Sequence, residues 1–453
     1  MSNSLIQKYN VPGPRYTSYP TVPYWQQETF SKSLWIDSVK KQFDFSNDIE
    51  GISLYIHLPF CESLCTFCGC HKRITKRHDV EEPYIWAVLK EWNLYLEIFG
   101  KKPLIKEIHL GGGTPTFFSE KNLEKLINGI LDKSEIAKDY EFSFEGHPNN
   151  TTKEHLQTLY NLGFRRVSFG VQDYSEKIQK AIHRLQPYQQ VAKVTLWAKE
   201  IGYTSVNHDL VFGLPFQTLE DVIDTIEKTN VLNPDRLAFY SYAHVPWIKG
   251  NGQRGFADED VPKDAQKREL YEVGKKLLSL NGFEEIGMDH FAKKSDQMHQ
   301  AFLQGKLNRN FMGYTTTNTR LLIGLGMSSI SDSWFGFAQN EKDLETYYKT
   351  IENNELALFK GHLLNHEDLI IRQHIRNIMC QFETQWSDNL YFEDLPEVLS
   401  ALKEIENDGL IKLYPEKLLV TEKGKAFIRN ICMAFDLRLK RIKPDRQLFS
   451  MTV

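Results

Sequence analysis

After residue 50, short runs rich in β-branched and aromatic residues alternate with helical patterns, and this alternation constrains the fold more than any other feature. The runs are ISLYIHLPF, IKEIHLGGG, YEFSFEGHP, RRVSFGVQ, SVNHDLVFGL and RLAFYSYAH. Strands that alternate with helices form a parallel sheet of βα units joined by right-handed crossovers. Six such units predict an α/β fold, a partial (β/α)6 TIM-like barrel.

Unusual polar residues stand at the carboxyl ends of these runs, where barrel enzymes place their chemistry. A group of cysteines follows the first run, and Gly112 ends the second within GGGTPT. Glu145 and Gln172 end the third and fourth runs, Asp209 lies in the fifth, and Ala243 follows the sixth. We therefore expect the six positions to meet at one rim of the barrel.

Composition changes along the chain predict three parts. Residues 1–50 include the Tyr- and Pro-rich stretch VPGPRYTSYPTVPYW and predict an extended arm with one amphipathic helix at about residues 29–43. Residues 51–360 hold the barrel. Residues 361–453 change to helices followed by short apolar runs, which predicts a mainly helical, winged-helix-like domain. This last part lacks a strong basic stripe, so we expect it to cap the barrel.

Charge and hydropathy exclude several classes of partner. A formal net charge of -4 over 453 residues does not indicate the excess of positive charge that proteins use to bind nucleic acid. The N-terminus, MSNSLIQKYN, lacks the apolar core of a signal peptide, and no apolar run approaches the roughly 18 residues of a membrane helix. We expect a cytoplasmic monomer that binds neither nucleic acid nor membranes.

Four of the six cysteines fall within ten residues, at Cys61, Cys65, Cys68 and Cys70. The C-x3-C-x2-C spacing can hold three corners of a cubane iron–sulfur cluster and leave one iron free for a substrate or cofactor. Structural zinc usually takes two C-x2-C pairs, and the sequence has no second pair. A catalytic dithiol would use Cys65 and Cys68 and leave Cys61 unexplained. The spacing therefore favours a cluster over zinc.

These cysteines resemble the signature of radical S-adenosylmethionine (SAM) enzymes, and the chain is most similar to the oxygen-independent coproporphyrinogen III oxidases, or coproporphyrinogen dehydrogenases. The shared stretches are PGPRYTSYPT, YIHLPFC, CTFCGC, GGGTPT, GVQD, DLVFGLP, NPDRLAFYSYAH, GMDHFA, NFMGYTT and FIRNICMAFD. The resemblance implies an oxidoreductase that converts two propionates of coproporphyrinogen III to vinyl groups, giving protoporphyrinogen IX for haem biosynthesis. It also implies a 4Fe-4S cluster, two SAM molecules and a reduced flavodoxin- or ferredoxin-type electron donor.

The same resemblance implies roles for individual residues. Cys61, Cys65 and Cys68 would be the metal ligands of the cluster. The first SAM site would include Tyr55, Gly112, Glu145 and Ile330. The second would include Phe67, Gly113, Thr114, Gln172, Arg184, Asp209 and Ala243. Cations and ring neighbours for a substrate with four propionates would come from Arg15, Tyr242, His290, Arg309 and Tyr314.

Some of these residues also have plainer interpretations. The glycines can form a tight turn, and Arg184 can pair with Asp209 in a structural salt bridge. Where the family pattern has an acidic residue after Glu145, this chain has Gly146 and His147. Cys70 is expected to mark the porphyrinogen-specific branch and not to be a fourth cluster ligand, because the fourth iron must stay free for SAM. The alternatives are a related radical SAM protein that handles haem or transfers methyl groups, and a zinc-stabilised DNA-binding protein.

Overall fold

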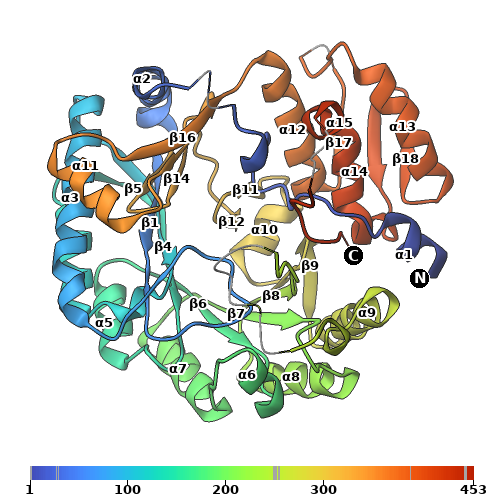
Figure 1. Ribbon diagram of the computed structural model, residues 1–453, viewed down its shortest axis with the longest axis horizontal. Helices are drawn as coiled ribbons and strands as arrows, with labels where there is room; N and C mark the ends of the chain where they lie inside the picture. Colours follow the sequence, from blue (N-terminus) through green and yellow to red (C-terminus); the bar gives the residue numbers. More distant parts are fainter. Residues whose placement is uncertain are drawn as a thin grey trace.

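A curved twelve-stranded sheet runs through the centre of the computed structural model, which describes residues 3–26, 28, 30–247, 253, 256–387, 389–442 and 446–452 (Figure 1). Its parallel strands are β1 (Ile52–Leu58), β4 (Leu104–Gly112), β5 (Glu135–Gly146), β6 (Arg166–Gln172), β7 (Ser205–Phe212), β8 (Arg236–Ser241) and β13 (Leu322–Leu325). Antiparallel strands extend the two edges: β14 (Ile330–Asp332), β15 (Gly336–Asn340), β16 (Leu358–Leu363), β9 (Phe283–Gly287) and β10 (His290–Lys293). The predicted α/β partial barrel is confirmed.

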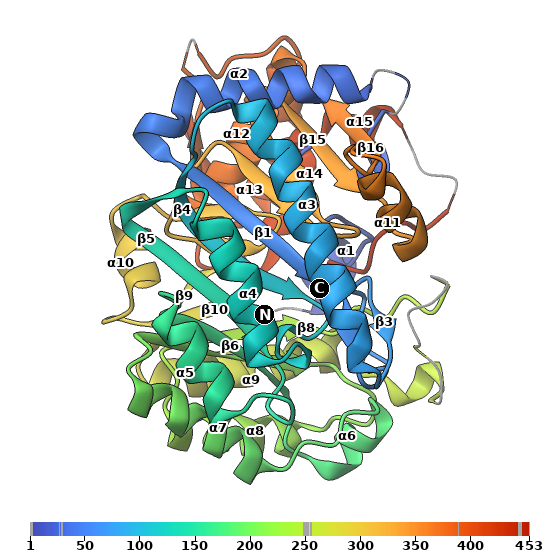
Figure 2. The same cartoon turned by 90° about the vertical axis from the view of Figure 1, so that its left-hand side faces the viewer.

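Helices cover the outer face of the sheet (Figure 2). They are α3 (Glu81–Phe99), α4 (Glu120–Leu131), α5 (Lys153–Asn161), α6 (Glu176–Ala181), α7 (Tyr188–Ile201), α8 (Leu219–Leu232), α9 (Asp264–Leu280) and α11 (Leu344–Glu352). Several begin at a polar residue whose side chain caps the first turn, such as Ser119 before α4, Thr152 before α5 and Thr218 before α8. None of the helices in the described ranges is long and apolar enough to cross a membrane.

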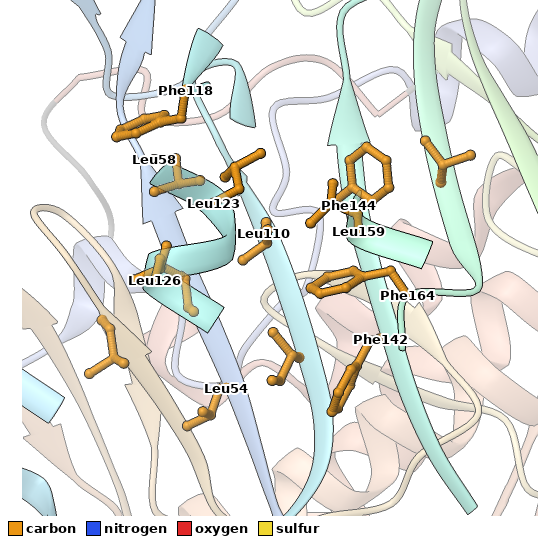
Figure 3. Packing of buried hydrophobic residues seen from close by; sticks show 14 of the residues in the cluster. Leu54, Leu58, Leu110, Phe118, Leu123, Leu126, Phe142, Phe144, Leu159 and Phe164 are labelled. Atoms are coloured by element: carbon orange, nitrogen blue, oxygen red, sulfur yellow. The ribbon is translucent and has the colours of Figure 1, made fainter. Parts of the chain in front are cut away.

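The main hydrophobic core lies between the parallel strands and these helices (Figure 3). Leu58, Leu110 and Phe144, from three successive strands, are fully buried there together with Leu126 of α4 and Leu159 of α5. Burial of such a side chain contributes about 1.5–3 kcal/mol. Successive side chains on a strand point to opposite faces, so the residues next to these buried ones face the barrel interior. The core therefore sets which residues face the site.

The N-terminal residues pack in two places. Helix α2 (Lys32–Glu50), longer than the helix expected at residues 29–43, buries Trp35, Val39 and Phe43 in the main core. Helix α1 (Asn3–Tyr9) and the stretch after it join a second core with the C-terminal part. There Pro12 forms an isolated antiparallel bridge with Met451, so the two ends of the chain lie side by side (Figure 1).

The C-terminal part consists of helices and a small antiparallel sheet, as the sequence predicts. Its elements are α12 (His366–Gln381), β17 (Glu383–Gln385), α13 (Leu395–Asn407), β18 (Ile411–Leu413), β19 (Lys417–Val420), α14 (Ile428–Phe435) and α15 (Leu437–Arg441). The three strands pair in the order β17-β19-β18. Shorter elements complete the fold: α10 (Gln297–Leu303), the pair β11 (Asn308–Asn310) and β12 (Gly313–Thr315), and the pair β2 (Phe60–Cys61) and β3 (Arg73–Ile74).

We expect Leu126→Ala to lower the free energy of unfolding by about 2–5 kcal/mol, because it leaves a cavity in the main core. The matched control is Leu196→Ala on α7, where the leucine is 55% exposed and the change should stay within about 0.5 kcal/mol. Urea denaturation followed by circular dichroism measures both. Equal losses in the two variants would contradict the position of the core.

Candidate functional site

A cavity of about 640 Å³ lies at the carboxyl ends of the parallel strands. It brings together most of the residues singled out from the sequence: Arg15, Cys61, Cys65, Phe67, Cys68, Cys70, Gly112, Gly113, Thr114, Glu145, Gln172, Arg184, Asp209, Tyr242 and Ala243. Most of these residues come from the amino-terminal arm, the cysteine loop after β2, and strands β4 to β8 or the residues just after them. Arg184 comes from the turn between α6 and α7. The rim expected from the strand pattern is therefore present as one concave surface.

The cysteine loop forms one wall of this cavity. Cys61 ends β2, and the loop after it is held by a hydrogen bond from the Thr66 N–H to the Ile182 carbonyl (3.0 Å). The Thr114 hydroxyl donates to the Cys61 Sγ (3.3 Å), and burial raises the pKa of the Cys61 thiol to about 11 despite that hydrogen bond. The Arg184 Nη1 donates to the Cys65 Sγ (3.6 Å). Each contact would favour the thiolate form that a metal cluster requires.

These residues fit an iron–sulfur cluster better than a single metal ion. Cys61, Cys65 and Cys68 all face the same cavity. Across the described ranges, however, no three His, Cys, Asp or Glu side chains are close enough together to hold one ion. A cubane is gripped at separate corners, so its ligands stand farther apart than those of a zinc ion. Thr114 and Arg184 each donate a hydrogen bond to a cysteine sulfur, which suits sulfurs that carry negative charge as ligands of a cluster.

Two glycines let β4 approach the strand that leads into the cysteine loop. Gly112 has φ +111°, and a Cβ there would lie 2.6 Å from the His57 ring. A Cβ on Gly113 would lie 2.5 Å from the Pro59 backbone. Only glycine suits such close contacts. The glycine run is therefore both a packing requirement and an exposed stretch of backbone on the cavity wall.

Glu145 extends from the end of β5 into the cavity, with 46% of its side chain exposed. His109 lies 3.4 Å from the carboxylate and stacks on Tyr55. Burial alone would raise the pKa of Glu145, but the hydrogen bond and charge of His109 outweigh it and lower that pKa. Tyr55 itself contacts His57 (3.0 Å) and stands behind the cavity wall, and Ile330 lies in β14; neither lines the cavity.

Arg184 and Asp209 both line the cavity, and in the described structure each bonds to other groups instead of to the other. The Arg184 Nη2 donates to the Gly170 carbonyl (2.6 Å), and its Nε is buried without an acceptor. Asp209 accepts from Ser168 (2.8 Å) and Asn207 (2.7 Å), and burial raises the pKa of its carboxyl to about 6. The expected alternative of an Arg184–Asp209 salt bridge is wrong. Both groups keep hydrogen-bonding capacity for a ligand.

The residues singled out for the substrate divide between two cavities. Arg15 and Tyr242 line the large cavity, where the Arg15 guanidinium donates to the Ser241 carbonyl (2.9 Å) and pairs with Asp289 (3.3 Å). His290 and Tyr314 line a chamber of about 110 Å³ inside the barrel, which shares Glu145, Ser168, Asp209 and Tyr240 with the large cavity.

Arg309 lines neither cavity but stacks over the Tyr314 ring, with its guanidinium carbon 4.5 Å from the ring centroid. Its Nη2 donates to the Arg15 carbonyl (3.4 Å), while its Nε and Nη1 are buried without a partner in the described part of the chain. Buried N–H groups without an acceptor are rare, and a carboxylate is an acceptor that a guanidinium binds strongly.

Sequence reasoning missed two groups at the site. Tyr240 borders both cavities. Side chains two residues apart on a strand point to the same side, so the sequence YSY places Tyr240 on the same side as Tyr242. Lys72 lies just beyond the cysteines and donates to the Cys68 carbonyl (3.0 Å) and the Cys70 carbonyl (3.3 Å). The signal for Lys72 was the basic stretch HKRITKRH, which follows the cysteine motif directly.

Comparisons with known proteins agree with this geometry. Residues 55–229 match the model of the radical SAM superfamily. The oxygen-independent coproporphyrinogen III oxidase of Escherichia coli K12 is 37% identical over 99% of this chain and 98% of its own length. The enzyme of the same name from Synechocystis is 36% identical over 100% of this chain and 98% of its own.

A solved structure of the Escherichia coli coproporphyrinogen III oxidase, described as a radical SAM enzyme, superposes with a TM-score of 0.88 at 35% identity, covering 96% of this chain and 98% of that one. Both the sequence and the fold therefore match along nearly the whole length. The chain belongs to the oxygen-independent coproporphyrinogen III oxidase family of the radical SAM superfamily.

Proposed function

We propose that this oxidoreductase of haem biosynthesis converts two propionate side chains of coproporphyrinogen III to vinyl groups and so forms protoporphyrinogen IX. One observation carries the proposal: the three cysteine thiols, two carboxylates and Arg184 of the family motifs all line one cavity. When bound, the cluster and SAM supply an electron and a 5′-deoxyadenosyl radical that removes one hydrogen atom from the propionate β-carbon. Loss of carbon dioxide, with transfer of one electron from the substrate radical to an external one-electron acceptor, then leaves the vinyl group.

The protein's own part in this reaction is to hold and orient the bound groups. Cys61, Cys65 and Cys68 would hold the cluster, because they are the three thiols of the motif that share the cavity. Cys70 is exposed at the same wall and would stay free of iron. Thr114 and Arg184 would stabilise the thiolates through the hydrogen bonds that they already donate.

We propose two SAM positions within the cavity, and two separate carboxylates support this assignment. The first position would use Tyr55, Gly112, Glu145 and Ile330, with Tyr55 acting from behind through His57 and His109. The second would use Phe67, Gly113, Thr114, Gln172, Arg184, Asp209 and Ala243, all at the cavity wall. Each carboxylate can accept from an ammonium group or from ribose hydroxyls, and Arg184 can bind a carboxylate.

The four propionates of the substrate need cations, and the arm and barrel provide them. Arg15 and Arg309 lie next to each other, and Arg309 has two buried N–H groups without an acceptor in the described residues. Tyr242, His290 and Tyr314 would contact the ring. The buried arm residues Tyr16 and Tyr19 help to fix Arg15 beside the cavity, where the arm would keep water from the radical.

We also propose a role for each of the three parts of the chain and a protein that supplies electrons. Residues 51–360 would perform the chemistry, while residues 1–50 and 361–453 would cover and brace the site. In support, the start of the arm shares the second hydrophobic core with the C-terminal part, and α2 packs in the main core. A reduced flavodoxin- or ferredoxin-type protein would supply electrons to a monomeric enzyme.

The reaction is tested by anaerobic incubation of the reconstituted protein with SAM, dithionite and coproporphyrinogen III. We expect two molecules of carbon dioxide and one of protoporphyrinogen IX for each substrate consumed, measured by gas trapping and chromatography. SAM cleavage without either product would contradict the assignment of coproporphyrinogen III as the substrate, but not the assignment of radical chemistry.

Replacing Cys61, Cys65 or Cys68 by Ala should remove the cluster, because each would take away one of its three ligands. Bound iron should fall from about four per chain to near zero, together with the visible absorbance and SAM cleavage. The matched control is Cys70→Ala, which should keep the iron and the absorbance. Loss of iron from that control would make Cys70 a ligand.

Asp209→Asn should raise the KM for SAM about tenfold at pH 8, because a hydrogen bond to a charged group is worth about 1.5–3 kcal/mol. The pKa of Asp209 is raised to about 6 by burial and by nearby Glu145, so the wild-type carboxylate is ionised above pH 6 and protonated below it. Wild-type KM should therefore rise as the pH falls through 6. The exposed Asp132→Asn is the control; an unchanged KM in Asp209→Asn would refute the assignment.

A further inference from the structure

A strongly basic segment follows the cysteine loop, and after Lys72 none of its residues lines the cavity described above. From His71 to Asp79 the sequence carries Lys72, Arg73, Lys76, Arg77 and one acid, Asp79, which gives four positive and one negative charge, or +3, against -4 for the whole chain. Arg73, Lys76 and Arg77 are exposed. A concentration of one charge on an otherwise acidic protein produces a local positive potential.

Two lysines from other elements extend this segment into a continuous surface. His71 is bonded to Ser328 (2.6 Å), whose N–H donates to the carbonyl of Glu341 (2.7 Å), the residue before Lys342. The Lys342 Nζ lies 5.5 Å from the centre of the Phe359 ring, and the next residue, Lys360, donates to the Val22 carbonyl (3.3 Å). Arg73 reaches α11 through an ion pair with Glu345 (2.6 Å). We call the surface formed by Lys72, Arg73, Lys76, Arg77, Lys342 and Lys360 the basic face.

Acidic groups neutralise only part of the basic face. Arg73 pairs with Glu345, and Arg77 pairs with Asp79. Lys72, Lys76, Lys342 and Lys360 make no ion pair with any carboxylate that the structure describes. Apolar side chains are exposed among these cations: Ile74 is 46% exposed, and Phe359, which lies under Lys342, is also 46% exposed. Exposed apolar groups surrounded by charge are typical of protein-binding surfaces.

The basic face is separated from the cluster ligands by a single strand. Strand β3 pairs with β2, which places Ile74 opposite Cys61, and the Thr75 N–H donates to the Cys61 carbonyl (2.9 Å). Strand β3 lies at the periphery of the molecule (Figure 2). Lys72 is bonded directly to the carbonyls of Cys68 and Cys70. Electron transfer slows steeply with distance, so a redox partner on this face would have a short route to the thiols.

We propose that the basic face is the docking surface for a small acidic electron-carrier protein, which seats its redox centre over β3. The proposal rests on the proposed function, because it assumes a cluster bound by Cys61, Cys65 and Cys68. In each encounter the reduced carrier loses one electron and leaves oxidised by one electron, and the thiolate-bound cluster gains that electron. Complementary charge would speed the encounter, and the exposed Ile74 and Phe359 would contribute apolar contact.

The test compares a charge reversal on the basic face with an equal reversal elsewhere. The variant is Lys76→Glu with Arg77→Glu, two exposed residues outside the cavity. The control is Lys403→Glu with Lys412→Glu, two exposed lysines of the C-terminal part that give the same change in net charge. The probe is a recombinant acidic flavodoxin, and the protein is the reconstituted full-length enzyme.

We expect the Kd for flavodoxin at low ionic strength and the rate of cluster reduction by reduced flavodoxin each to worsen about tenfold or more in the variant. The control should match the wild type, and added salt should weaken wild-type binding toward the level of the variant. Dithionite is a small reductant that needs no docking surface, so cluster reduction and product formation with dithionite should be equal in all three proteins.

Other results would count against the basic face. Equal flavodoxin affinity and reduction rates in the variant and the control would overturn the docking surface. A higher KM for coproporphyrinogen III in the dithionite assay of the variant would mean that the face attracts the anionic substrate, and would overturn the proposal as well. Failure of all three proteins to form product with dithionite, while flavodoxin binding differs as expected, would reject the proposed reaction and keep the docking surface.

Discussion

The close pairing of β1 with β4 is the contact on which the site depends. The Gly113 N–H donates to the Leu58 carbonyl (2.8 Å), and the Thr114 N–H donates to the Phe60 carbonyl (3.0 Å). These bonds continue the parallel ladder past the ends of the strands and bring Thr114 to the Cys61 sulfur (3.3 Å). Any side chain at position 113 would collide with the backbone of Pro59. The glycines therefore position the cysteine loop before they contact any ligand.

The inside of the barrel is charged, and several of its polar groups pair with one another. Glu107 of β4 accepts from Ser53, Thr315 and Thr317, which ties the strand β12 and its following turn beneath the sheet. Arg236 pairs with Asp296 (2.6 Å), and both are almost completely buried. Breaking such a pair leaves an unpaired buried charge and costs several kcal/mol. Polar contacts thus hold the lower end of the barrel, although the Arg236 Nη1 and Nη2 have no partner among the described residues. At the upper rim, Arg184, Asp209 and Glu145 line the large cavity.

The sequence could predict the rim because parallel strands end at the same edge, so position along the chain determines position in space. That argument placed Gly112, Glu145, Gln172, Asp209 and Ala243 at one cavity. It could not tell that Arg184 bonds Gly170 and Cys65 instead of Asp209, since loop residues have no period that fixes their direction. Nor could it place Arg309 over Tyr314, because these residues face each other across the β11–β12 pair, and the pattern of two three-residue strands does not fix which residues pair.

The cysteine loop has two sides, and the pairing of its flanking strands keeps them apart. On the inner side, β1 and β4 leave the sulfurs facing the cavity beside Arg184. On the outer side, the β2–β3 pair exposes Arg73 and Ile74 to solvent directly behind Cys61. In the proposed reaction, an iron that binds SAM must face inward, where water can be excluded, whereas the proposed electron carrier is a protein too large to enter the cavity. A short loop lying between the cavity and an exposed strand meets both requirements, and β3 forms because the chain returns after the last cysteine of the motif to run parallel to β2.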